Sequence, residues 1–498
     1  MTAQRHQPNI LIVVADTARA DHLSCYGYPR KTSPWIDRIA AEGCLFETAI
    51  TPAPFSPAAY ASIFSNQYPH QHGVNGDTVR IWPDSMPRLA RKMRDLGYYT
   101  FCVSNNDFVS EATNAHLGFD AFQGPRESWM RNKHQSVTRR VRDTIGAAPA
   151  KWLAHMGHRM FGLEKGDSAD AVRSAQACIK VAGEKPFFGF VILMDPHAMY
   201  HPQRRAFVTN PESAKRFLHE INGPQMWAKL MANGTGLSPD LFQAAMDFYD
   251  AEIHHCDSAI GTLYESLAQS GKLDETLLTI CADHGEAFGE HGVWGHGFCL
   301  NDCLTRVPLV VRWPGFKKKG IRSRALVTLN ALHNTCLAVA QPTLHEQPGA
   351  HDLTRAADPN WAGDEAVFSE FPIQSQTLAM LRKLNPAGDF TQWAQNIYAV
   401  RTRQWRYIEY QNGACELFNL ETDPGESSSV HHQQPTICHD LHTRLAAHLG
   451  RATTATACAT ARHPTTAVGT PPPIPTEPSP DTLDESVLNR LRALGYLD

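Results

Sequence analysis

The chain has 498 residues, of which 42% are hydrophobic and 19% are charged, and its formal net charge is −4. This composition is typical of a globular protein, and the length allows an extensive core. Charges of both signs are interspersed, which argues against a general nucleic-acid-binding surface. No apolar stretch reaches the roughly 18 residues that a membrane-spanning helix needs.

The cysteines bear on the compartment in which the protein works. Twelve are scattered along the chain without a C-x-x-C pair, and several lie in apolar segments. This pattern favours buried thiols over a disulfide framework. The first apolar run, residues 10–15, is too short for a signal peptide. We therefore expect a cytoplasmic protein.

Short apolar segments alternate with helix-like patterns along the first two thirds of the chain. They predict strands at residues 9–15, 99–103, 187–194, 277–282 and 307–312. Such alternation indicates an α/β fold with a mostly parallel sheet covered by helices. Ligands of such sheets gather at the carboxyl ends of the strands. The polar residues expected at these ends are Asp16, Ser56 after a loop, Asp195 to His197, and Asp283 with His284.

The remaining segments predict the domain organisation. Residues 1–350 are expected to form the main domain, and residues 351–450 a smaller α+β subdomain. In the subdomain, segments 400–410 and 415–419 predict an antiparallel pair joined by a turn at Asn412-Gly413. Three further segments are an insertion at about 127–170, an Ala/Thr/Pro-rich linker at 451–481 and a C-terminal helix at 482–498. The basic stretch 126–142 is either a solvated face, or a rim for an anionic substrate or a surface for a partner.

Residues 51–74, TPAPFSPAAYASIFSNQYPHQHGV, resemble the nucleophile segment of the sulfatase family, within the alkaline phosphatase superfamily. The Tyr-Pro-His and His-Gly of this segment place the nucleophile position at Ser56. In the family this position is a Cys or Ser within C/S-x-P-x-R and is oxidised to formylglycine. Here Ala58 and Tyr60 replace the Pro and the Arg, so we expect no such modification. Tyr60 offers a neutral hydrogen-bond donor to the substrate in place of the Arg.

Two other segments resemble the metal-binding parts of that family. Asp16 lies in VVADTARADH, and Asp283 and His284 lie in LLTICADHGEAFGEHGVWGHG. The resemblance implies a three-layer α/β/α fold and one divalent metal ion held by Asp16, Asp283, His284 and Ser56. An imidazole ligand favours Mn, Fe or Zn, while Ca or Mg stays open. Without the resemblance, capping or core roles would explain the same residues.

The resemblance also implies roles around the reacting group. His197, in FVILMDPHAMYHP, corresponds to a histidine that reaches the leaving-group oxygen and could act as a general acid. His296 lies near the position at which the family commonly has a lysine that contacts anionic oxygens of the substrate. His291 is either a scaffold residue or a substrate contact, and Arg19 either organises the nucleophile or forms a structural salt bridge. Glu286 and Glu290 are expected to be structural.

Together these segments predict a metal-dependent hydrolase that works without formylglycine. Its expected substrate is a small anionic sulfate, phosphate or phosphonate ester. Ser56 could attack directly as a metal-activated nucleophile, or position a water. The alternative is a catalytically inactive relative that binds an anionic ligand or partner. A lipid headgroup phosphotransferase is disfavoured because no membrane span is expected. The sequence leaves the substrate and the oligomeric state open.

Overall fold

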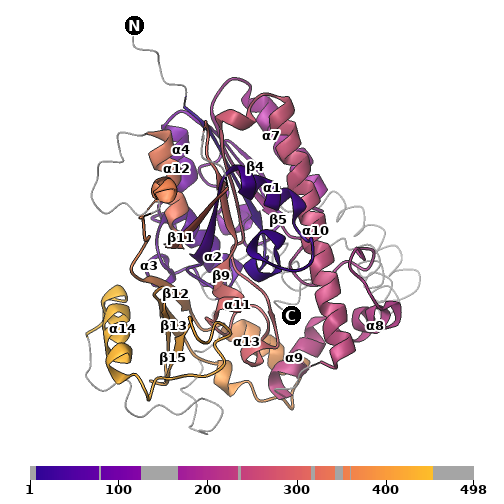
Figure 1. Ribbon diagram of the computed structural model, residues 1–498, viewed down its shortest axis with the longest axis vertical. Coiled ribbons are helices and arrows are strands. Elements are labelled where there is room, and N and C mark those ends of the chain that lie inside the picture. The colour runs from indigo at the N-terminus through magenta and orange to yellow at the C-terminus, as the bar shows by residue number, and fades with distance from the viewer. Residues whose placement is uncertain are drawn as a thin grey trace.

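A large, mostly parallel sheet forms the centre of the molecule, as predicted (Figure 1). The computed structural model describes residues 7–77, 80–124, 167–233, 237–315, 320–341, 352–358 and 360–452. Within these residues the sheet has nine strands in the order β11-β2-β10-β6-β1-β5-β3-β4, and β9 pairs with β2. The strands are β1 (Asn9–Ala15), β2 (Cys44–Ile50), β3 (Tyr99–Val103), β4 (Ala121–Gln123), β5 (Phe187–Leu193), β6 (Thr276–Cys281), β9 (Arg306–Val307), β10 (Leu309–Arg312) and β11 (Ile321–Thr328).

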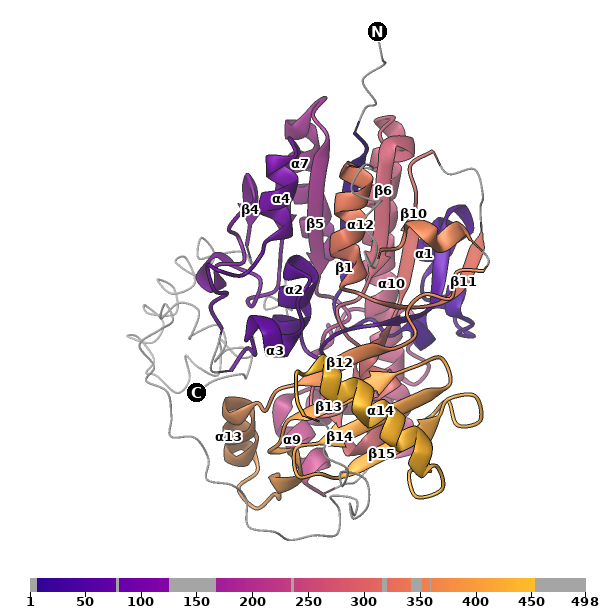
Figure 2. The same cartoon turned by 90° about the vertical axis from the view of Figure 1, so that its left-hand side faces the viewer.

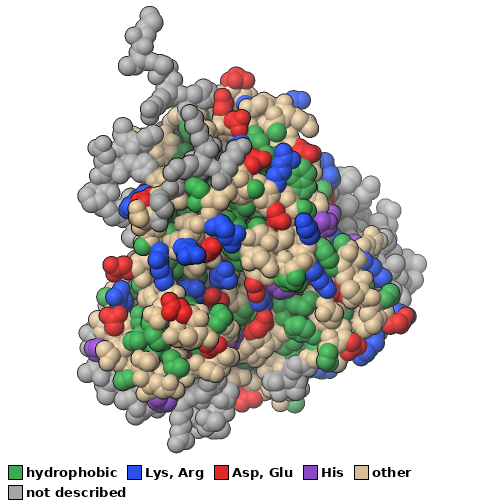
Figure 3. Space-filling view, in the orientation of Figure 1, with side chains coloured by type: hydrophobic (Ala, Val, Ile, Leu, Met, Phe, Trp, Pro, Cys, Tyr) green, Lys and Arg blue, Asp and Glu red, His purple; other side chains and the backbone are tan. Residues whose placement is uncertain are grey.

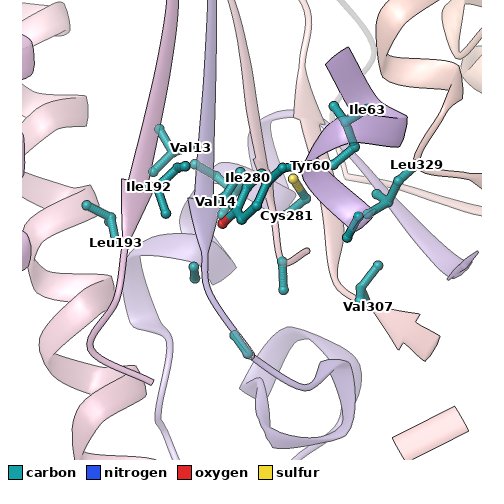
Figure 4. Packing of buried hydrophobic residues seen from close by; sticks show 14 of the residues in the cluster. Val13, Val14, Tyr60, Ile63, Ile192, Leu193, Ile280, Cys281, Val307 and Leu329 are labelled. Atoms are coloured by element: carbon teal, nitrogen blue, oxygen red, sulfur yellow. The ribbon is translucent and has the colours of Figure 1, made fainter. Parts of the chain in front are cut away.

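Strand β1 lies in the middle of this sheet and is parallel to β5 on one side and β6 on the other. Val13 is therefore opposite Val191 and Ile280. All seven residues of β1 are buried, as expected for a parallel strand covered on both faces. Figure 4 shows Val13 and Val14 in the same buried cluster as Tyr60, which comes from a helix beside the sheet.

Helices cover both faces of the sheet (Figures 1 and 2). One face is covered by α1 (Pro34–Glu42), α7 (Ser168–Ala182) and the long α10 (Pro239–Gln269). The other is covered by α2 (Ser56–Ser65), α4 (Leu89–Asp95) and α12 (Ala331–Ala340). Further elements are α3 (Pro69–His72), α8 (Pro211–Arg216), α9 (Pro224–Asn233), α11 (Asp302–Thr305), α13 (Ser375–Leu384), β7 (Ala287–Phe288) and β8 (Trp294–Gly295).

The sheet differs from the sequence prediction between β2 and β6. The segment predicted as a strand at 307–312 is divided at Pro308 into β9 and β10, because proline lacks the N–H that a continuous ladder requires. Strand β10 is antiparallel to both β6 and β2, so the sheet is mixed. Strands β2, β4 and β11 were not predicted, because their sequences mix polar and apolar residues and carry a weak period-two signal.

A second, antiparallel sheet follows the main one in sequence. Its strands are β12 (Val367–Phe371), β13 (Ile397–Arg401), β14 (Trp405–Tyr410) and β15 (Cys415–Asn419), and α14 (Pro435–His448) packs on it. The predicted hairpin of β14 and β15 is present, and Gly413 has φ 84° in its turn. The predicted strand 400–410 is divided by a turn, in which Thr402 Oγ1 accepts a hydrogen bond from Trp405 N at 2.9 Å.

Several predicted segments lie outside the described residues. They are the basic stretch 126–142, most of the insertion 127–170, most of the linker 451–481 and the helix 482–498. No helix among the described residues is long and apolar enough to cross a membrane. The described cysteines form no disulfide with one another. Acidic and basic side chains are interspersed over the face shown in Figure 3.

Candidate active site

The candidate site lies at the carboxyl ends of β1 and β6. Asp16 follows the last residue of β1, and Asp283 follows β6 after one intervening residue. Because the two strands are adjacent and parallel, with Val14 opposite Cys281, their carboxyl ends meet at one edge of the sheet. Both aspartates are fully buried there. The structure thus brings these two predicted ligands together.

Each aspartate uses one oxygen for hydrogen bonds within the protein. Asp16 Oδ2 accepts from Asn106 Nδ2 at 2.9 Å and from the Tyr60 hydroxyl at 3.1 Å. Asp283 Oδ1 accepts from the backbone N–H of Thr17 at 3.2 Å. The other oxygens, Asp16 Oδ1 and Asp283 Oδ2, are buried and have no hydrogen-bond partner within the described residues. Buried carboxylate oxygens without donors are costly unless a cation pairs with them, so the pair fits a divalent metal ion.

The electrostatics of the two carboxylates lead to the same conclusion. Burial raises the pKa of Asp16 well above its ordinary value, and the nearby charge of Asp283 raises it further. Burial also raises the pKa of Asp283. Two neighbouring buried carboxylates resist ionising together in the absence of a positive charge. A divalent cation between them would offset both effects.

His284 completes the predicted ligand group. Its Nδ1 lies 2.8 Å from the carbonyl oxygen of Gly285 and donates to it, which leaves the lone pair on Nε2. Nε2 lies 3.4 Å from Asp283 Oδ2. Burial lowers the pKa of His284 well below its ordinary value, and His296 lowers it further, so the ring is neutral. The ligand atoms of Asp16, Asp283 and His284 lie within 4.8 Å of one another.

Ser56 is the first residue of α2, and its hydroxyl is directed at this group. Ser56 Oγ lies 3.2 Å from His284 Nε2 and 3.5 Å from Asp16 Oδ2. The alanines at positions 58, 59 and 61 are fully buried, and their small side chains let α2 approach the sheet closely. The amino end of a helix of ten residues also favours a negative charge near Ser56.

Two further histidines lie next to His284. The ring centroid of His296 is 4.6 Å from that of His284 and 4.9 Å from that of His197. His296 Nδ1 lies 3.1 Å from Glu286 Oε1. Burial lowers the pKa of His296, but the charge and hydrogen bond of Glu286 and the charge of Asp16 outweigh it, so the pKa is raised. His296 is therefore the histidine of the site best suited to carry a proton.

Arg19 and His291 have other neighbours. The Arg19 guanidinium donates to Glu290 Oε1 at 2.7 Å, to the Glu286 carbonyl at 2.9 Å and to the Asp21 carboxylate. The Arg19 charge is thus matched by two carboxylates. Its hydrogen bonds to Glu286 and Glu290 hold the turn that follows Asp283. His291 lies on the turn between β7 and β8, where the charges acting on it include Glu290 and Glu416 of β15.

The structure adds Asn106 to the site, a residue that the sequence analysis missed. It lies three residues beyond β3, at the same edge of the sheet, and its amide donates to Asp16. A polar run, Ser104 to Asp107, follows the buried strand and could have signalled it. The structure also gives Glu286 a contact to His296, although the sequence analysis had predicted only a structural role for it.

A model of the sulfatase family matches residues 8–342, which is more than half of the chain and includes every residue of the candidate site. The chain belongs to the sulfatase family. This membership places it among ester hydrolases, as predicted from the sequence. Bovine (Bos taurus) arylsulfatase K is 22% identical to it, over 88% of this chain and 81% of that protein.

Solved structures of low sequence identity share the fold of this sulfatase-family chain. The structure of BT4656 in complex with its substrate D-glucosamine-2-N,6-O-disulfate has a TM-score of 0.65 at 18% identity, covering 89% of this chain and 98% of that one. The phosphonate monoester hydrolase of Agrobacterium radiobacter has a TM-score of 0.62 at 19% identity, covering 89% and 95%. The predicted fold class is thereby confirmed.

Proposed function

We propose that this sulfatase-family chain is a divalent-metal-dependent hydrolase that cleaves a sulfate, phosphate or phosphonate ester with an unmodified Ser56. One observation carries the proposal. Ser56 Oγ, His284 Nε2 and two buried carboxylates converge at the carboxyl ends of β1 and β6. Nothing in the packing of the fold requires two donor-deficient carboxylate oxygens to be buried side by side there.

The metal would be held by Asp16, Asp283 and His284, with the Ser56 oxygen beside them. Two carboxylates and one imidazole suit Mn, Fe or Zn better than Ca or Mg. When bound, such an ion supplies Lewis acidity, which offsets the charge of the anionic ester and lowers the pKa of a neighbouring hydroxyl. Asn106 and Tyr60 hold the Asp16 carboxylate in place through their hydrogen bonds.

Ser56 acts as the nucleophile in this proposal. As its oxygen attacks sulfur or phosphorus, the Ser56 proton must pass to a base. Asp16 Oδ2, at 3.5 Å, can take it without using the lone pair of His284. The amino end of α2 and the protonated His296 stabilise the negative charge on the non-bridging oxygens.

His197 protonates the leaving-group oxygen as it departs, which leaves the sulfuryl or phosphoryl group on Ser56. Water then attacks this group, so that the anion is released and the Ser56 hydroxyl is regenerated. His197 lies in the segment that follows β5, and its ring centroid is 4.9 Å from that of His296. Arg19 acts indirectly, because it holds the turn from Glu286 to Glu290, and Glu286 in turn positions His296. Tyr60 occupies the place of the arginine in the formylglycine signature and binds Asp16 instead.

The experiment combines metal analysis with a panel of aryl sulfate, phosphate and phosphonate monoesters. Wild type is expected to carry about one equivalent of a divalent metal and to hydrolyse at least one of the esters. Asp283→Ala should lose both properties. The matched control is Cys281→Ala, which removes a fully buried side chain two residues earlier without removing a ligand. It should keep both.

Peptide mass mapping across Ser56 completes the test. An unmodified serine is expected, and a mass lower by two hydrogen atoms would reveal formylglycine and overturn the proposed nucleophile. A wild-type protein that holds no metal and hydrolyses no member of the panel would overturn the enzyme proposal. That outcome would leave the inactive anion-binding protein as the better interpretation.

A further inference from the structure

A second group of potential metal ligands lies outside the candidate active site. It consists of His70 in α3, Glu370 in β12 and His448 at the end of α14. One atom of each residue, His70 Nδ1, Glu370 Oε1 and His448 Nε2, lies within 4.8 Å of the other two. Glu370 and His448 also lie beyond residue 342, where the match to the sulfatase family ends.

The group joins the two sheets of the molecule. Helix α3 contacts β12, and α14 packs on the sheet to which β12 belongs. The three elements lie close together in both views (Figures 1 and 2). Helix α3 follows α2, and the two helices are in contact. Nε2 of His72 in α3 lies 3.0 Å from Oγ of Ser62 in α2. The group therefore connects the helix that begins at Ser56 with the C-terminal sheet and its helix.

We propose that His70, Glu370 and His448 form a second metal site, for Zn²⁺, that fastens the C-terminal sheet and α14 to the segment following α2. Two imidazoles and one carboxylate hold zinc in some metalloenzymes, where water takes the fourth position, so the same three donors can hold the ion here. The His70 side chain is 26% exposed, whereas those of Glu370 and His448 are 2% and 9% exposed. The ion would thus enter from the His70 side, where a water ligand also has room.

The distances require only a small adjustment for zinc. His70 Nδ1 and His448 Nε2 lie 2.6 Å and 2.9 Å from Glu370 Oε1, as hydrogen bonds do. Tetrahedral zinc with bonds of about 2.0 Å separates its ligand atoms by about 3.3 Å. Each nitrogen would move away from Glu370 Oε1 by roughly half an ångström to admit the ion. The two nitrogens, which lie within 4.8 Å of each other, would also adjust their separation. The two imidazole nitrogens would then give up the protons that they donate to the carboxylate.

The surroundings already orient the three ligands. The second oxygen of Glu370, Oε2, accepts the backbone N–H of His70 at 2.8 Å. The His448 ring stacks on Phe368 at a centroid distance of 3.9 Å and meets the edge of Tyr68 at 4.4 Å. In protein metal sites, contacts of this kind from surrounding residues orient the side chains that bind the metal. A purely structural hydrogen-bonded clamp is the competing explanation, and it needs no metal.

The test uses the full chain without a polyhistidine tag and with Asp16→Ala and Asp283→Ala, so that the candidate active site no longer holds a metal. Equilibrium dialysis against Zn²⁺ should show one remaining equivalent. Co²⁺ should give the visible absorption of a tetrahedral site, and Zn²⁺ should raise the Tm. None of these readouts depends on whether wild type hydrolyses any ester, so failure here is distinguishable from failure of the proposed function.

Adding Glu370→Gln or His448→Gln to this background should weaken Zn²⁺ binding by at least about 100-fold. The matched control is His442→Gln, on the same helix, because His442 Nδ1 pairs with Glu409 Oε2 at 2.7 Å without a third ligand. It should leave binding unchanged. If His448→Gln fails to fold, His70→Asn tests the same site from its exposed side. Absence of bound Zn²⁺, or equal binding by the His442 and ligand variants, would overturn the second site and favour the hydrogen-bonded clamp.

Discussion

The hydroxyl oxygen of Ser56 lies 3.2 Å from Nε2 of His284, across 228 residues of sequence. Nδ1 of the same ring donates to the Gly285 carbonyl, so the lone pair of Nε2 is directed at the group that contains the serine. A serine at the start of a helix, beside a neutral imidazole and two carboxylates, is placed for chemistry at its oxygen.

Replacing Ser56 by alanine distinguishes a nucleophile from a residue that only positions water. We expect Ser56→Ala to lower kcat by at least about 10³-fold, because loss of a nucleophile removes the covalent route. Metal content should be unchanged, since Asp16, Asp283 and His284 remain. Rapid quenching of the wild-type reaction should also trap the sulfated or phosphorylated Ser56 peptide, detected by its mass. A variant that keeps most of the wild-type kcat would show that Ser56 does not attack.

Glu286→Gln tests whether a protonated His296 is needed. Glu286 raises the pKa of His296 through its charge and hydrogen bond, so its neutralisation should lower that pKa. The imidazolium would then be lost at a lower pH, and the alkaline limb of the kcat/KM profile should shift to lower pH. The control is Glu290→Gln, because Glu290 pairs with Arg19. An unchanged alkaline limb in Glu286→Gln would exclude this role for His296.

Tyr60→Phe removes the hydroxyl that donates to Asp16 Oδ2 while keeping the ring, which packs edge-to-face on Phe190 at 6.2 Å. A lost hydrogen bond to a charged group costs about 1.5–3 kcal/mol. We expect metal affinity to fall by roughly 10- to 100-fold, measured by competition with a chelator. The control is Tyr98→Phe, whose hydroxyl donates to the Pro8 carbonyl away from the site. Equal metal affinity in both variants would contradict a supporting role for Tyr60.

Asp257 makes stability depend on pH. Its buried carboxylate accepts the backbone N–H groups of Trp35 and Ile36 at the start of α1, and burial raises its pKa to about 7. Because this pKa lies above the unfolded value, the protonated form favours the folded state. The resulting stabilisation is fully present below the unfolded pKa and is lost as pH rises towards 7.

Asp257→Asn cannot ionise, so it should remove that pH dependence. The difference in unfolding free energy between the variant and wild type should change by up to about 1.4 kcal/mol per pH unit between about pH 4 and pH 7. Urea unfolding at several pH values measures it. The same pH dependence in both proteins would show that Asp257 does not titrate between these limits.

Local patterns in the sequence were enough to predict much of the fold. Strands β1 and β3 were predicted with their observed bounds, since both are apolar runs that end in polar residues. The division of the segment at Pro308 was missed, although proline carries a clear signal there. Strands β2 and β11 were missed because polar residues interrupt their apolar residues without a regular period-two alternation.

The sequence by itself determined the family, the central parallel strands and the positions of Asp16, Ser56, Asp283 and His284, because each lies in a contiguous segment with its own pattern. Only the tertiary structure decided which side chains support them. Asn106 reaches Asp16 across 90 residues, and His70 reaches Glu370 across 300. The physical reason is that hydrogen bonds and metal ligation act over a few ångströms, so pairs this distant in sequence become neighbours only when the sheets and helices pack.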